Sequence, residues 1–192
     1  MRISYKQIMD LKPCYDPKEI GMLESYEATL VDFINEYRHK VKSMNDILWV
    51  VLREDFIDVK TLRLFACWCA RESLSKIDNP DQRSINAVEV AERFAHGEAT
   101  KEELLAAESA AWSAAWSAAW SAESVAESAA WSAARSVADS AYSAAGLVTW
   151  SVAYSAWAAA GLVAWSAQID KIIEMIKENE QTGLNDDLYK QG

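Results

Sequence analysis

The sequence predicts an all-α protein, in which an N-terminal helical bundle is followed by long Ala/Ser/Trp-rich helices packed as hairpins. A four-residue word, Ser-Ala-Ala-Trp, recurs from residue 109 and continues in altered forms to residue 167. Alanine has the highest helix propensity and the word contains no proline, so a helix is its most favourable conformation. The period near four residues also argues against a half-buried strand, whose side chains would alternate every two residues.

Capping and breaking residues mark the helices that precede the repeat. Ser4, Ser43 and Asp58 each stand before an apolar run, where their side chains can accept a hydrogen bond from the first helical turn. The sequence Asn-Pro-Asp at 79–81 should end the central helix, and Gly97 should end the next one. The expected helices cover residues 5–11, 26–40, 47–53, 59–74 and 82–96.

The repeat starts after a capping box, Thr100-Lys-Glu-Glu103, and carries its largest side chains on one face. On a helical wheel with 100° per residue, the four indoles between positions 112 and 131 fall within about 100° of one another. A shared indole face of this kind can bury a large area against a neighbour. The four indoles are Trp112, Trp116, Trp120 and Trp131.

Two acidic residues on the indole face give it a mixed character. Glu123 and Glu127 fall among the indoles, and a dry core would not tolerate two unpaired carboxylates. We therefore interpret the face as a boundary, partly packed and partly wet, where a partner or a second copy can bind. The expected interaction residues are Trp112, Trp116, Trp120, Glu123, Glu127, Trp131 and Arg135.

The repeat is too long to keep one stripe on a straight helix. Its steps average about 3.8 residues rather than 3.6, so the stripe would drift around the helix. Gly146 and Gly161 are the expected breaks, which gives two or three helices folded on each other, with a right-handed coiled assembly as the alternative. The expected parts are an N-terminal domain (1–99), repeat helices (100–178) and a polar tail (179–192).

Composition narrows the classes of function. The 192 residues carry 19 basic and 29 acidic side chains, a net charge of −10, which argues against direct binding to nucleic-acid backbones. Three cysteines are too few for a disulfide framework and suggest a reducing compartment, the cytoplasm of a host cell. No secretory signal is expected from the first residues.

The sequence offers no recognisable catalytic constellation. His39 and His96 each stand near an expected helix C-terminus, where a positive imidazole favours the helix dipole. We find no Cys/His spacing for zinc, no Gly-rich phosphate loop and no Gly-x-Ser-x-Gly motif. We therefore expect no enzyme, and no catalytic, cofactor or metal site.

An uncharged stretch raises a membrane alternative. Residues 140–169 contain no charge and are long enough to cross a bilayer. They are mostly Ala and Ser, however, and Trp150 and Trp157 would lie in the middle of the membrane instead of at its interfaces. We favour a buried helix of a soluble bundle and expect no membrane insertion.

Several segments resemble the predicted immunity-protein family of bacterial polymorphic toxin systems, whose similar proteins occur in phages and prophages. They are residues 12–17 (Lys-Pro-Cys-Tyr-Asp-Pro), 62–71 (Leu-Arg-Leu-Phe-Ala-Cys-Trp-Cys-Ala-Arg), 79–84 and 91–100, followed by the Ala/Trp tract. The resemblance covers roughly residues 1–135 and implies an all-α protein that binds and neutralises another molecule. It brings no catalytic residues. Ser stands in this repeat where relatives often carry Arg or Asp, so charge-based contacts do not transfer.

These observations predict a non-enzymatic immunity or counter-defence protein that binds and inhibits a partner protein, a toxin or host defence component. Three alternatives remain open. The chain could be a structural homo-oligomer that buries its Trp/Ala faces against each other, a membrane-inserting helical protein, or a nucleotide or nucleic-acid mimic or binder. The last draws on the acidic charge and on the ability of indoles to stack on bases.

Overall fold

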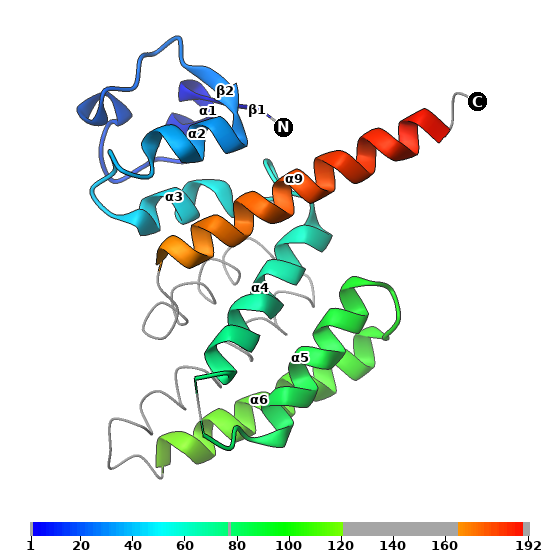
Figure 1. The fold of residues 1–192 in the computed structure, drawn as a ribbon. Helices are drawn as coiled ribbons and strands as arrows, with labels where there is room; N and C mark the ends of the chain where they lie inside the picture. The colour runs from blue at the N-terminus through cyan, green and yellow to red at the C-terminus, as the bar shows by residue number, and fades with distance from the viewer. Residues whose placement is uncertain (1, 77, 121–164, 190–192) are drawn as a thin grey trace.

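The computed structural model describes the backbone of residues 2–76, 78–120 and 165–189, and the side chains of residues 2–76, 78–113 and 165–182. These residues form mainly helices together with one small antiparallel sheet (Figure 1). In chain order the elements are β1 (Arg2–Ser4), α1 (Tyr5–Asp10), the 3-10 helix η1 (Pro17–Ile20), β2 (Glu27–Thr29), α2 (Leu30–Tyr37), α3 (Met44–Val51), α4 (Val59–Leu74), α5 (Gln82–Ala95), α6 (Lys101–Trp120) and α9 (Trp165–Tyr189).

The first hydrophobic core joins the N-terminal elements to the C-terminal helix. α9 contacts α2, α3 and α4, although it comes from the other end of the chain (Figure 1). Ile169 and Ile172 of α9 are fully buried there, in one cluster with Leu30 and Phe65. This core therefore needs both ends of the sequence.

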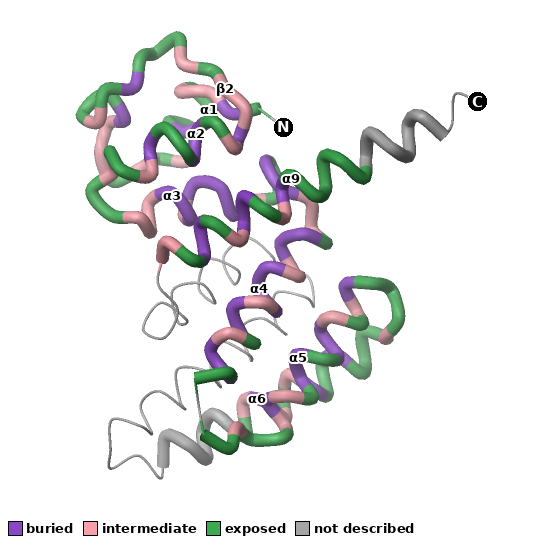
Figure 2. The backbone as a smooth tube through the Cα atoms, viewed as in Figure 1, coloured by how far each residue is buried: buried purple, intermediate pink, exposed green. Residues whose placement is uncertain are grey.

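The second hydrophobic core lies between α4, α5 and α6. It is built from small and medium side chains, which let the helices approach closely. Its buried members are Cys67, Ala70, Leu74, Ala87, Val88, Val90, Ala91, Leu104, Ala107 and Ala111. α4 contributes to both cores, because Leu62 and Phe65 face the first while Ala70 and Leu74 face the second. Figure 2 shows buried positions along most of its length.

The capping residues that the sequence predicts are present. Ser4 and Ser43 each form a capping box, and Asp58 accepts a hydrogen bond from the first turn of α4 at 2.9 Å. Ahead of the repeat helix, the Thr100 N–H donates to Glu103 Oε2 at 2.7 Å, and the Glu103 N–H donates to Thr100 Oγ1 at 3.2 Å. These predicted caps are confirmed, although α3 starts at Met44, directly after its cap, and not at residue 47 as expected.

The small sheet corrects one predicted helix. Residues 26–40 are expected as a single helix, but Glu27–Thr29 form β2, which pairs in antiparallel fashion with β1. The helix starts only at Leu30, because Thr29 is its cap and accepts a hydrogen bond from the Asp32 N–H at 3.1 Å. Ile3 pairs with Ala28, which is far from it in the sequence, and the spacing of residues within one segment cannot predict such a contact.

The last helix is longer than its apolar spacing indicates. The buried isoleucines end at Ile176, yet the backbone of α9 stays helical to Tyr189, across most of the segment expected as a polar tail. Residues 177–182 of α9 are exposed (Figure 2). The expected repeat breaks at Gly146 and Gly161 lie outside the described residues.

Replacing Ile172 with alanine tests whether α9 completes the first core. The side chain is 0% exposed, so its truncation should lower the free energy of unfolding by about 2–5 kcal/mol. Lys177→Ala on the exposed part of the same helix should change it by less than about 0.5 kcal/mol. Urea denaturation followed by circular dichroism measures both, and equal effects would contradict the packing.

Candidate functional site

The start of the repeat helix is held against α5 by a narrow stripe of small residues. Leu104, Ala107 and Ala111 of α6 are buried at spacings of three and four residues, which places them on one helix face. They pack against Val88 and Ala91 of α5. This face of α6 is therefore used inside the molecule.

Trp112 is the only predicted interaction residue whose side chain the structure describes. It is half-buried and packs against the edge of the second core. Glu108 lies one turn earlier. The pKa of its carboxyl is raised, because the effect of partial burial exceeds the opposing effect of a hydrogen bond with Trp112. This first indole is thus partly packed and partly wet. The side chains of Trp116, Trp120, Glu123, Glu127, Trp131 and Arg135 lie outside the described residues.

The other side of the α6 start is open to solvent. Ala106, Ser109 and Ser113 are exposed, and the Leu105 side chain is 47% exposed. Among the described residues it is one of three large apolar side chains with this degree of exposure. An apolar side chain beside exposed small residues gives a surface that a partner can approach closely.

Polar contacts join the neighbouring helices beside this surface. Arg71 of α4 forms a two-pronged pair with Glu92 of α5 at 2.5 Å, and Arg93 of α5 contacts Glu103 of α6 at 3.2 Å. Arg83 Nη1 also donates to Ser113 Oγ at 3.2 Å. These contacts are partly exposed, so the buried side chains of the second core supply most of the energy that holds α6 on α5.

Both histidines lie where the sequence places them. His96 is the C-terminal cap of α5, and its Nδ1 lies 2.8 Å from the backbone oxygen of Glu92. His39 is exposed just after α2. In the described part of the chain, the structure contains no group of three or more His, Cys, Asp or Glu side chains suited to a metal ion.

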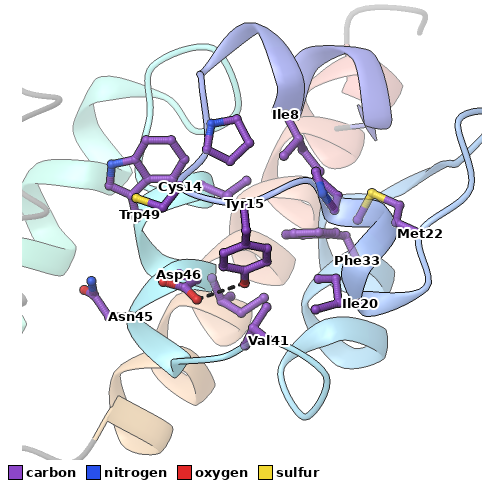
Figure 3. A pocket seen from close by; sticks show the side chains of 14 residues that line it. Ile8, Cys14, Tyr15, Ile20, Met22, Phe33, Val41, Asn45, Asp46 and Trp49 are labelled. Carbon is purple, nitrogen blue, oxygen red and sulfur yellow. Dashed lines mark hydrogen bonds between the residues drawn. The ribbon is translucent and has the colours of Figure 1, made fainter.

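An apolar pocket lies on the opposite part of the molecule, between α1, η1, α2 and α3 (Figure 3). Its volume is about 130 Å³. Buried side chains, among them Ile8, Met22 and Phe33, form the interior, while Tyr15 and Trp49 are only half-buried. The complete lining is Ile8, Pro13, Cys14, Tyr15, Pro17, Ile20, Met22, Phe33, Val41, Asn45, Asp46, Ile47, Trp49 and Val50.

Tyr15 supplies the main polar contact of the pocket. Its hydroxyl donates a hydrogen bond to Asp46 Oδ2 at 2.9 Å (Figure 3), and the Lys42 ammonium lies 4.4 Å from the centre of its ring. Burial, reinforced by the bond to Asp46, raises the pKa of Tyr15 from 10.0 to about 12. Lys42 is itself paired with Glu19 at 2.8 Å. Lys42 and Glu19 therefore balance each other, and the Asp46 carboxylate leaves one net negative charge beside the Tyr15 hydroxyl.

Sequence reasoning missed this pocket. No sequence pattern assigns a site to residues 14–17 or to Asp46. Asp46 Oδ2 completes the cap of α3 by accepting the Ser43 N–H at 3.1 Å, and the same oxygen also accepts the Tyr15 hydroxyl. The available signal was a tyrosine between two prolines in a loop, which does not reveal which helix the ring will face.

None of the helices in the described ranges is long and apolar enough to span a bilayer. Most of the uncharged stretch 140–169 lies outside those ranges. Comparisons of the chain with protein-family models, curated proteins and solved structures give no match. The resemblance to immunity proteins therefore stays a prediction.

Native-state thiol labelling should modify one cysteine of three. Cys14 is exposed, whereas Cys67 and Cys69 are buried, and burial raises the pKa of the Cys67 thiol to about 12. A thiol reagent should react rapidly with Cys14 alone, and with all three after unfolding in denaturant. Mass spectrometry of the labelled protein counts the sites. Rapid native labelling at Cys67 would contradict the packing of the second core.

Tyr15 should make stability fall at high pH. Its pKa is raised in the folded protein, so its contribution is complete below about pH 10 and is lost as pH rises towards about 12. In Tyr15→Phe, the unfolding free energy should fall less steeply between pH 10 and 12, because up to about one proton fewer is released on unfolding. Urea denaturation at several pH values measures the slope. An unchanged slope would show that the Tyr15 hydroxyl is not protected.

Proposed function

We propose that this chain is a non-enzymatic interaction protein that binds and inhibits a partner protein through its repeat helices. The observation that carries the proposal is the two-sided packing of α6. One side is held on α5 by Leu104, Ala107 and Ala111, while Leu105 and its exposed neighbours remain open. An anchored helix with an open side can present the following residues to another protein without losing its own position.

The chemistry of the repeat supports a protein partner over a nucleic acid. The net charge of −10 opposes contact with phosphate backbones. Tryptophan is enriched where binding energy is concentrated in protein interfaces, because it buries a large area with few rotatable bonds. Continued hairpin packing of the repeat, as the glycines predict, would place several indoles beside Trp112.

The biological setting that we propose follows from the sequence resemblance to immunity proteins. In that setting the chain acts in the cytoplasm of a bacterial host and belongs to a phage or prophage. Its partner is a toxin or a defence component whose activity is blocked by binding. The proposal requires no cofactor.

A triple substitution tests the proposed surface. Replacing Trp112, Trp116 and Trp120 with alanine should remove partner capture from host lysate, because the indoles supply most of the buried area. The matched control is Lys177→Ala, which alters an exposed position of α9 away from the α6 surface and should keep the partner. Circular dichroism verifies that both variants remain folded. The captured protein is then purified, and the wild-type chain should inhibit its activity whereas the Trp variant should not.

The same variant separates an inhibitor from a structural oligomer. Light scattering gives the mass of the wild-type and Trp-variant proteins. Lost partner binding with an unchanged mass supports the inhibitor. A drop from oligomer to monomer, with no protein captured by the wild type, would replace the proposal with a self-association role for the indole face.

A further inference from the structure

The pocket of the N-terminal elements takes no part in the proposed role of α6. It lies in the first core, whereas α6 packs in the second. We propose that this pocket is a binding site for one uncharged aromatic ring, carried by a small molecule of the size of benzene or indole. Its volume, its lining and its accessible mouth all suit such a ring.

The volume suits a single ring. Apolar cavities of about 150 Å³ in other proteins stay free of water and bind benzene. The pocket measures about 130 Å³, so one six-membered ring fits, while a larger fused system must extend through the mouth. Met22 and Phe33, which are 2% and 3% exposed, close the base of the pocket, and the half-buried lining residues border the open space above them.

The lining selects an uncharged group. The Tyr15 hydroxyl and the Asp46 carboxylate, the polar groups seen together in Figure 3, already bond to each other at 2.9 Å. Asp46 receives a second bond from the Ser43 N–H. An anionic ligand would be repelled by Asp46 and would lose its hydration on entry, so the lining favours an uncharged ring over an anionic one.

Aromatic walls favour a ring over an alkyl chain. Three aromatic residues of the lining come from different elements. Tyr15 lies in the loop that follows α1, Phe33 lies in α2, and Trp49 lies in α3. Aromatic pairs in offset or edge-to-face contact gain energy beyond the area that they bury. Tyr15 and Trp49 are half-buried and leave part of their rings open, so a bound ring can contact them directly.

The mouth of the pocket contains a built-in reporter. Cys14 lines the pocket and is exposed, whereas the other two cysteines are buried. A bound ring should shield the Cys14 sulfur from alkylation. The rate of native alkylation therefore measures occupancy at this one position.

Indole and benzene are the probes for the test, with benzoate as the anionic counterpart. Calorimetry on the full chain should show saturable binding of one ring per chain, with benzoate at least about tenfold weaker. Saturating indole should slow alkylation of Cys14 several-fold, roughly in proportion to occupancy.

Two variants fill the pocket and one serves as the control. Ile20→Phe and, independently, Val41→Phe place extra volume in the lining and should weaken indole binding by at least about tenfold. Leu23→Phe adds the same ring nearby on a side chain that is 71% exposed and not part of the lining, and should bind within about twofold of wild type. Circular dichroism selects the filling variants that fold.

Three results would overturn the proposal. They are the absence of saturable binding by the wild type, equal binding by folded filling variants and Leu23→Phe, and binding of a tryptophan-containing peptide without binding of either ring probe. The last result would assign the pocket to a protein partner. None of them bears on the Trp variants of α6, so failure here and failure of the inhibitor proposal are distinguishable.

Discussion

The packing of α4 is the constraint on which the rest of the structure depends. Leu62 and Phe65 belong to the first core, and Cys67, Ala70 and Leu74 belong to the second. A helix that is apolar on most sides must be covered on most sides, because exposing those side chains costs about 25 cal/mol for each Å² of apolar surface. α9 and the N-terminal helices cover one part, and α5 with α6 covers the other.

This arrangement separates two surfaces of different character. On the second core, the helices are held by small side chains and by ion pairs such as Arg71 with Glu92, and α6 is directed away with one side open. On the first core, large side chains leave an apolar pocket beside Tyr15. We propose the α6 surface for a protein partner and the Tyr15 pocket for a single small ring. The two proposals involve different residues and can be tested independently.

The two surfaces also differ in how visible they are in the sequence. The indole face is a local property of one helix, because side chains three and four residues apart must lie on the same side. The wheel places Trp112 at a boundary, and the structure finds it half-buried beside Glu108. The pocket combines side chains of α1, the following loop, α2 and α3. No spacing rule links Ile8 to Trp49, so the pocket exists only once these elements pack.

By itself, the sequence determined the mainly helical class, the caps at Ser43, Asp58 and Thr100 and the central position of α4. Each of these follows from a hydrogen bond within one turn or from the periodicity of one helix, which neighbouring residues fix. Tertiary structure alone decided the pairing of β1 with β2, the return of α9 to the N-terminal core and the Tyr15 pocket. These depend on contacts between residues far apart in the chain, and those contacts form only where burial of apolar surface offsets the entropy of closing the intervening loop.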